Sequence, residues 1–145
     1  MAKVSVYLNF NGQAEEAFEF YKSVFQTEYL DGISRFADVP PAENMPLLSE
    51  EDKKLVMHVS LPITGDFILM GCDSPSSIGM KAEFGNNVHL NLEPDTRKEA
   101  DRLFNALAEG GTITMPQADM FWGAYFGSLT DKFGIHWMVN CPLKV

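Results

Sequence analysis

Apolar and polar positions follow regular patterns along the first half of this 145-residue chain. Residues 3–10 alternate between apolar and polar side chains, which predicts a strand with two chemically different faces. The following residues repeat apolar side chains at helical spacing, which predicts a helix with one buried stripe: Ala14, Ala17, Phe18, Tyr21, Val24 and Phe25. Three further strands are expected over residues 27–37, 55–62 and 66–72, with a proline-rich, acidic loop over residues 38–54.

The same order of elements begins again at residue 87. A strand over residues 87–94 precedes Thr96 and Glu99, whose spacing is typical of a helix capping box. The expected helix ends at Gly110 and Gly111. Its stripe is Ala100, Leu103, Phe104, Leu107 and Ala108, and strands are expected over residues 112–115, 123–129 and 135–141. The chain therefore reads as two βαβββ modules, residues 1–73 and 87–145, joined by a connection over residues 74–86.

Composition and charge limit the classes of molecule that the protein is expected to bind and its expected location. The chain has 20 acidic and 11 basic residues and a formal net charge of −9, which disfavours nucleic acid and anionic membrane surfaces. No apolar run has the length of a membrane span and the N-terminal residues lack the features of a secretory signal, so a cytoplasmic location is expected. Cys72 and Cys141 have neither zinc-type nor CxxC spacing, so free thiols are expected.

Three stretches carry a family resemblance: YLNFNGQAEEAFEFYKSVF, MHVSLPITGDFILMGCDSP and MFWGAYFGSLTDKFGIHWMVN. Together with the repeated module, they resemble the vicinal oxygen chelate superfamily of glyoxalases, bleomycin resistance proteins and extradiol dioxygenases, and within it the PhnB-like branch. The resemblance implies an α+β fold in which two tandem βαβββ modules form a curved mixed sheet around a cleft. It also implies a homodimer.

Members of this branch often carry a demethylubiquinone methyltransferase label. A doubly wound methyltransferase needs a parallel sheet and a glycine-rich turn after its first strand. The segment after the first expected strand has one glycine, Gly12. Methyl transfer is therefore disfavoured.

The resemblance also places the superfamily's metal ligands near Ser5, Met70, His89 and Met138. Only His89 is a good ligand for a hard or borderline divalent metal, because a neutral serine binds weakly and a thioether prefers soft ions. No metal or other cofactor is expected. If a metal is bound, His89 and His58 are the candidate ligands.

Alternation predicts which side chains share the cleft with these positions. Residues two apart along a strand lie on the same face, so all three histidines of the chain fall on one expected concave surface. Trp122 and Tyr125 are candidates for its wall, although packing in the core or in a dimer interface is the favoured role for Trp122. The candidate cleft residues are Ser5, Tyr7, Asn9, His58, Met70, His89, Asn91, Trp122, Tyr125, His136 and Met138.

These observations favour a protein that binds a small polar or anionic molecule in a cleft between the modules, without the usual metal site. Whether it is an enzyme stays open, because no paired nucleophile and base is recognisable. Two alternatives remain. One is a metal-dependent lyase, isomerase or dioxygenase with a rearranged histidine site, and the other is a non-catalytic sequestering or structural dimer.

Overall fold

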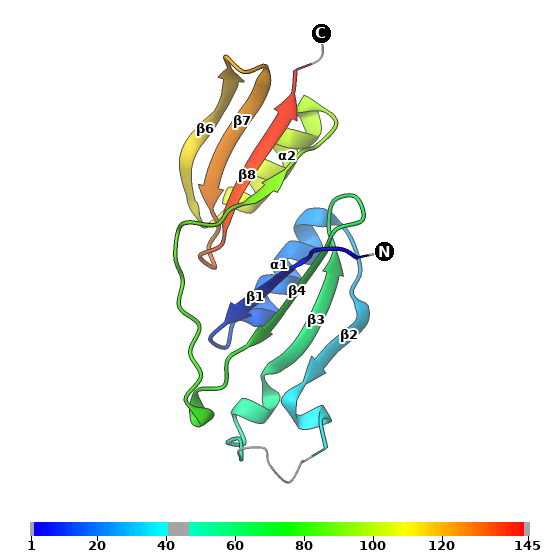
Figure 1. Cartoon of the computed structure of the whole chain (residues 1–145), viewed down its shortest axis with the longest axis vertical. Coiled ribbons are helices and arrows are strands. Elements are labelled where there is room, and N and C mark those ends of the chain that lie inside the picture. Colours follow the sequence, from blue (N-terminus) through cyan, green and yellow to red (C-terminus); the bar gives the residue numbers. More distant parts are fainter. Residues whose placement is uncertain (1, 41–46, 144–145) are drawn as a thin grey trace. The chain divides into compact units, whose positions relative to one another are not determined.

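The chain forms two compact units, Met1–Glu83 and Phe84–Val145. The structure is a computed structural model that describes residues 2–40 and 47–143, so part of the loop expected over residues 38–54 lies outside the described residues. The boundary between the units falls inside the segment 74–86. Each unit has its own sheet and its own helix (Figure 1).

The first unit is a mixed four-stranded sheet with the strand order β1-β4-β3-β2. The strand β1 runs parallel to β4, and the other neighbours are antiparallel. Short 3-10 turns follow β2, precede β3 and follow β4. The elements are β1 (Val6–Phe10), α1 (Ala14–Phe25), β2 (Leu30–Arg35), η1 (Phe36–Asp38), η2 (Asp52–Lys54), β3 (Val56–Pro62), β4 (Ile68–Asp73) and η3 (Ser76–Ile78).

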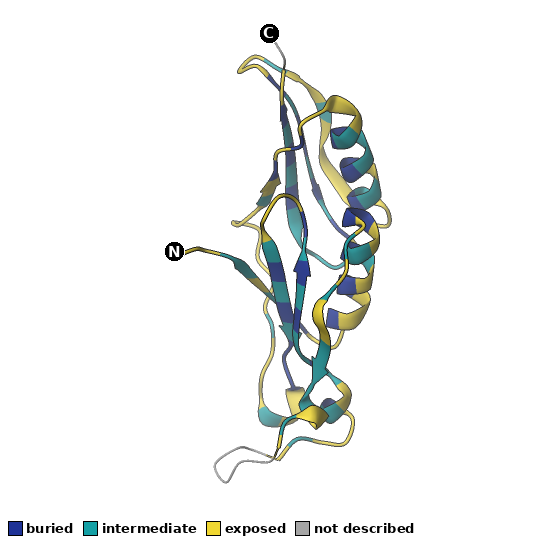
Figure 2. Ribbon diagram, turned by 90° about the vertical axis from the view of Figure 1, so that its right-hand side faces the viewer, coloured by how far each residue is buried: buried dark blue, intermediate teal, exposed yellow. Residues whose placement is uncertain are grey.

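The helix α1 covers one face of this sheet, where it packs on β3 and β4. Its predicted stripe is confirmed, since the same six residues are its buried ones. Figure 2 shows the buried residues of the helix turned toward the strands. The helix α1 approaches β4 most closely at Gly71 among the glycines of this sheet, because an added Cβ there would lie 2.6 Å from Phe18 Cε1. No helix in the described part of this unit covers the opposite face of the sheet, which is called the uncovered face.

The second unit repeats the topology, with the strand order β5-β8-β7-β6 and one parallel pair, β5 with β8. The predicted fold class is therefore confirmed in its essentials: two repeated βαβββ modules, each with a mixed sheet. The elements are β5 (Leu90–Leu92), α2 (Arg97–Ala108), β6 (Thr112–Met120), β7 (Ala124–Thr130) and β8 (His136–Pro142).

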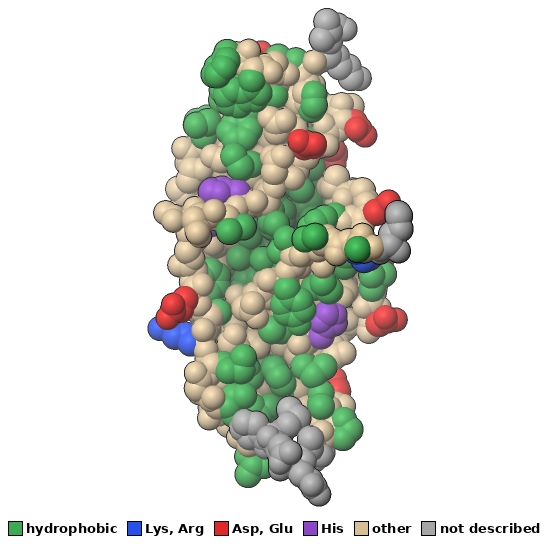
Figure 3. Space-filling view, in the orientation of Figure 1, with side chains coloured by type: hydrophobic (Ala, Val, Ile, Leu, Met, Phe, Trp, Pro, Cys, Tyr) green, Lys and Arg blue, Asp and Glu red, His purple; other side chains and the backbone are tan. Residues whose placement is uncertain are grey.

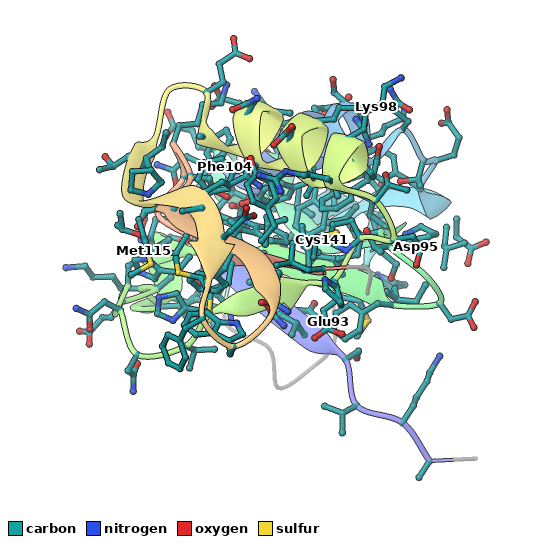
Figure 4. The ribbon with its side chains drawn as sticks, turned by 90° about the horizontal axis from the view of Figure 1, so that it is seen from above. Glu93, Asp95, Lys98, Phe104, Met115 and Cys141 are labelled. Carbon is teal, nitrogen blue, oxygen red and sulfur yellow. The ribbon has the colours of Figure 1, made fainter. Side chains whose placement is uncertain are left out.

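The helix α2 begins where the capping box was predicted. Thr96 accepts a hydrogen bond from the Glu99 backbone N–H at 3.1 Å, but the Glu99 carboxylate pairs with Arg102 instead of returning to the cap. Four residues of the predicted stripe are buried, whereas Ala108 at the helix end is only partly buried. Phe104 is directed toward the sheet and Lys98 away from it (Figure 4). No helix in the described part of the chain is both long and apolar enough to span a membrane.

The strand β6 runs further than predicted, through Pro116 to Met120. Proline lacks a backbone N–H, so it interrupts a central strand but is tolerated at an edge. Because β6 is the last strand in the order of its sheet, Pro116 costs no hydrogen bond to a further strand.

Candidate functional site

The uncovered face of the first sheet carries several of the polar side chains predicted for a cleft. Tyr7 and Asn9 alternate on β1 with Leu8 and Phe10, which face the helix side. The register pairs Tyr7 with Met70 and Asn9 with Cys72 on β4. Met70 is also paired with Ser60 of β3, so a row of side chains crosses the face from β1 through β4 to β3. Figure 3 presents this face of the unit, with few charged side chains on it.

His58 joins two hydroxyl groups on this face. Its Nδ1 lies 3.2 Å from Tyr7 Oη, and its Nε2 lies 2.8 Å from Ser60 Oγ. A hydroxyl can donate or accept, so both neutral tautomers of the imidazole are satisfied by the same two partners. Tyr7, His58 and Ser60 therefore form a hydroxyl-imidazole-hydroxyl chain, which can change its direction of donation without moving a heavy atom.

Tyr7 holds its proton more firmly than an ordinary tyrosine. Burial of part of the ring and hydroxyl raises the pKa of Tyr7 to about 12, and the neighbouring Cys72 adds to the effect. The phenol is therefore neutral at physiological pH and available as a hydrogen-bond donor. Its exposed fraction of 44% leaves room for a bound molecule to reach it.

Cys72 lies beside this chain and donates from Sγ to Asn9 Oδ1 at 3.2 Å. Burial raises the pKa of the Cys72 thiol, a hydrogen bond with Tyr7 lowers it by less, and Asp73 raises it again. The thiol form is therefore favoured, and this residue is a poor nucleophile at neutral pH.

A groove opens on the same face, at the end of the sheet where β3 turns into β4. Its volume is about 540 Å³, within the range of small-molecule sites. Met70 links the groove to the His58 chain, because it lines the groove and is paired in the sheet with both Tyr7 and Ser60. The lining residues are Lys3, Val4, Ser5, Leu30, Thr64, Asp66, Phe67, Ile68 and Met70.

In the second unit, the rings of His89 and His136 lie side by side. His89 directly precedes β5, and His136 is the first residue of β8. Their ring centroids are 5.3 Å apart. His136 Nε2 lies 2.7 Å from the Gly85 carbonyl oxygen, and its Nδ1 lies 2.8 Å from Thr130 Oγ1. A carbonyl only accepts, so Nε2 of His136 carries a proton and its orientation is fixed by the backbone. His136 thus has a structural bonding pattern, whereas His89 is exposed beside it.

Asn91 and Met138 are paired across β5 and β8 on the uncovered face of the second sheet. Trp122 lies in the turn between β6 and β7, is 52% exposed and packs edge-on against Phe126 at 5.6 Å. The structure therefore divides the predicted cleft residues between the units. The first contains Ser5, Tyr7, Asn9, His58 and Met70, and the second contains His89, Asn91, Trp122, Tyr125, His136 and Met138.

Tyr125 lies on the helix side of its sheet, so its predicted place in the cleft wall is wrong. It is paired with Cys141, which shares a face with Trp137 and Val139 toward α2. Its hydroxyl donates to Asp101 Oδ1 of α2 at 2.6 Å, and the Arg97 guanidinium lies 3.9 Å from its ring centroid. Tyr125 therefore binds α2 to its sheet through Asp101 and Arg97 and does not line the predicted cleft.

Two buried aspartates organise the loops around the sheets. Asp131 accepts from the Phe133 and Ile135 backbone N–H groups and from Trp137 Nε1. Asp73 was not singled out from the sequence. It is 1% exposed and accepts from the backbone N–H groups of Gly12, Ala14 and Val56, so it closes β4 against the start of α1 and of β3.

A divalent metal, which the superfamily resemblance implies, does not fit the donors at the predicted positions. Ser5, Met70 and Met138 supply a neutral hydroxyl and two thioethers, and both ring nitrogens of His58 face hydroxyl groups. Among residues 2–40 and 47–143, no three His, Cys, Asp or Glu side chains come together as a set of metal ligands.

Two βαβββ units of this topology, each with a helix on one face, define the vicinal oxygen chelate fold. The crystal structure of a glyoxylase/bleomycin resistance protein/dioxygenase domain from Frankia sp. EAN1pec shares it, with a TM-score of 0.66 over 99% of this chain and 94% of that chain. The two sequences are 12% identical, so this likeness concerns the fold alone.

Within that fold, the chain belongs to the PhnB-like family described as 3-demethylubiquinone-9 3-methyltransferase, whose model matches residues 2–140. It is 34% identical to protein YjdN of Escherichia coli (strain K12) over 142 residues, which cover 94% of this chain and 93% of YjdN. The crystal structure of protein PA1353 from Pseudomonas aeruginosa has 36% identity and a TM-score of 0.84, over 99% of this chain and 100% of that chain. A protein described as putative 3-demethylubiquinone-9 3-methyltransferase, PhnB protein, from Bacillus cereus has 32% identity and a TM-score of 0.73, over 97% and 99% of the two chains.

Proposed function

We propose that this protein binds a small polar or anionic molecule on the uncovered face of its first unit, without a metal. The observation that carries the proposal is the His58 chain beside the groove. Tyr7, His58 and Ser60 offer hydrogen bonds whose direction can reverse, and Met70 connects them to a groove of about 540 Å³. An apolar lining with a few polar groups at one side is the usual composition of a small-molecule site.

The first step of recognition is the exclusion of water from the groove by the ligand's body. A polar group of the ligand that extends past Met70 replaces water at Tyr7 Oη, whose raised pKa keeps it a donor. His58 adapts by taking the tautomer that the ligand's own donor or acceptor requires, because Ser60 satisfies its other nitrogen in either state. This arrangement supports binding and proton exchange, and it contains no activated nucleophile.

The description of the family suggests methyl transfer to demethylubiquinone, but the first βα connection speaks against that reaction here. A doubly wound methyltransferase leaves the backbone N–H groups after its first strand free to approach the cofactor. In this chain the N–H groups of Gly12 and Ala14 both donate to Asp73 Oδ1 at 2.9 Å. Each sheet also contains a single parallel pair of strands.

A ligand screen tests the proposal. Purified protein is screened by thermal shift against small phosphonates, dicarbonyls, phenols and antibiotics, beside the variants Met70→Trp and Met138→Trp. Met70→Trp fills the groove, whereas Met138→Trp makes the same change on the uncovered face of the second unit. A ligand that stabilises the wild type and Met138→Trp but not Met70→Trp supports the proposal.

Two results would overturn it. One is a ligand whose effect survives in Met70→Trp and disappears in Met138→Trp. The other is a stoichiometric divalent metal in protein purified without chelators or metal-affinity resin, lost on changing His58 or His89 to Ala. That second result favours the metal-dependent lyase, isomerase or dioxygenase.

The proposal includes a homodimer. Its support is the turn between β6 and β7, where Phe121 is 97% exposed and packs edge-on against the half-exposed Trp122. Exposed neighbouring aromatic rings are enriched at protein interfaces. Light scattering after size-exclusion chromatography should give the mass of a dimer for the wild type and of a monomer for Phe121→Ser, and a wild-type monomer refutes this part.

A further inference from the structure

The groove of the first unit has one cationic and one anionic side chain in its lining, Lys3 and Asp66. Both are exposed, and neither takes part in an ion pair or a side-chain hydrogen bond within the described residues. Opposite charges in one groove that do not neutralise each other are available to opposite charges on a ligand.

The remaining lining is largely apolar, and three of its apolar side chains are exposed. Val4 is 89% exposed, Leu30 is 46% exposed and Phe67 is 36% exposed. Phe67 is held in place by its hairpin, because its carbonyl accepts from the Ile63 N–H at 3.0 Å and its own N–H donates to the Thr64 carbonyl. Asp66 precedes it on the same hairpin, so the anion and the aromatic ring are presented together.

Each simple class of ligand leaves part of this lining unmatched. An anion satisfies Lys3 but is repelled by Asp66 and by the net charge of −9. A cation satisfies Asp66 and is repelled by Lys3. An uncharged apolar molecule covers the apolar side chains but removes water from two charges without replacing it, which costs free energy.

A zwitterion with an apolar side chain has an opposite charge for Lys3, an opposite charge for Asp66 and an apolar part for the apolar lining. Resting on the proposed function, we propose that the groove binds a free α-amino acid with a large apolar side chain. Its carboxylate pairs with Lys3, its ammonium pairs with Asp66, and its side chain packs on Phe67, Ile68 and Met70. The volume of about 540 Å³ is sufficient for such a molecule.

The experiment uses the full chain and four matched probes. L-phenylalanine has both charges and a ring, 3-phenylpropanoate lacks the ammonium, 2-phenylethylamine lacks the carboxylate, and glycine lacks the ring. Each is titrated into isotopically labelled protein, and dissociation constants are taken from the backbone amide shifts of residues 64–70. L-phenylalanine is expected to bind more tightly than the other three.

Charge-removing variants assign the two contacts. Asp66→Asn should weaken L-phenylalanine by about two- to fivefold, the range for one exposed charge pair, without weakening 3-phenylpropanoate. Lys3→Met should weaken L-phenylalanine and 3-phenylpropanoate but not 2-phenylethylamine. Lys81→Met and Glu83→Gln change exposed charges of the same unit outside the groove and should leave all four constants unchanged.

The results separate the ligand class from the proposed function. If 3-phenylpropanoate or 2-phenylethylamine binds as tightly as L-phenylalanine, the zwitterion is refuted and the groove remains a small-molecule site. If L-phenylalanine does not shift residues 64–70 while another compound binds in a Met70-dependent way, the ligand class alone is wrong. If no compound of either experiment binds at the groove, both proposals fail.

Discussion

Replacing Asp73 by asparagine should destabilise the first unit by several kcal/mol. Asp73 is 1% exposed, and its carboxylate accepts three backbone hydrogen bonds. In Asp73→Asn the amide oxygen can still accept from Gly12 and Ala14. The amide nitrogen, however, is a donor and faces the Val56 N–H, which is itself a donor.

The magnitude follows from these contacts. A hydrogen bond to a charged group contributes about 1.5–3 kcal/mol, and a buried donor left without a partner costs about 1–3 kcal/mol. The hydrogen bond from Val56 is lost, and the amide nitrogen introduced by Asp73→Asn and the Val56 N–H are two donors that face each other. The free energy of unfolding should therefore fall by about 3–5 kcal/mol. That is a large share of the roughly 5–15 kcal/mol that stabilises an ordinary domain.

Urea unfolding followed by far-ultraviolet circular dichroism measures this loss. Asp95→Asn is the matched control, because Asp95 is exposed and accepts no hydrogen bond in the described structure, and its effect should stay within about 0.5 kcal/mol. Hydrogen exchange gives a local readout, since the amides of Gly12 and Val56 should lose protection first. A loss below about 1 kcal/mol for Asp73→Asn, with both amides still protected, refutes the reasoning.

Three further predictions concern single side chains. Because burial raises the pKa of Tyr7 to about 12 in the folded state, its contribution to stability is present below pH 10 and is lost as the pH rises toward 12. The urea midpoint of the wild type should therefore fall more steeply than that of Tyr7→Phe over this range, and parallel curves contradict the shift. The raised pKa of Cys72 should make iodoacetamide labelling of the folded protein slower than that of free cysteine at pH 8, whereas equal rates would indicate an exposed thiolate. Within the described residues Gln117 Nε2 is buried without a hydrogen-bond partner, so Gln117→Met should raise the free energy of unfolding by about 1 kcal/mol, and a decrease in urea experiments would show that the amide is satisfied.

Both helices could be predicted from the sequence because their stripes are periodic over three turns. The six buried residues of α1 are the six that helical spacing selects, and Thr96 caps α2 as expected. Strand faces were harder to predict. Val56 is two residues from His58, so alternation predicts one face for both. Val56 is nevertheless buried, because the pairing of β2 with β3 passes from His58 to Val56 and leaves Met57 as a bulge.

Tyr125 shows why alternation alone cannot orient a strand that is apolar on both sides. Tyr125, Gly127 and Leu129 form one face of β7, and Phe126 and Ser128 form the other, so composition does not decide between them. The register with β8 does decide, since it sets Tyr125 beside Cys141 on the side of α2. A register is a long-range property that the local sequence does not contain.

Asp73 and the groove were missed for a related reason. The amides that Asp73 binds belong to residues 61, 59 and 17 positions away, so no local motif marks the contact. The groove is built from the N-terminal residues, β2, the hairpin and β4, which only the folded sheet brings together. What the sequence did contain was a polar side chain at every second position of β1, which marked the face opposite the helix.

The two copies of the module use their uncovered faces differently, and this difference locates the proposed site. His136 donates to a backbone carbonyl, so its tautomer is fixed and its ring serves as a tie to Gly85. His58 has hydroxyl partners at both nitrogens, so its tautomer can follow the ligand. An imidazole can change its tautomer to suit a ligand's donor or acceptor only if its own partners can both donate and accept. In the first module, the hydroxyl groups of Tyr7 and Ser60 are such partners, and they lie next to the groove. Duplication thus supplies two similar sheets, and the partners of one histidine on each sheet separate a structural role from the proposed binding role.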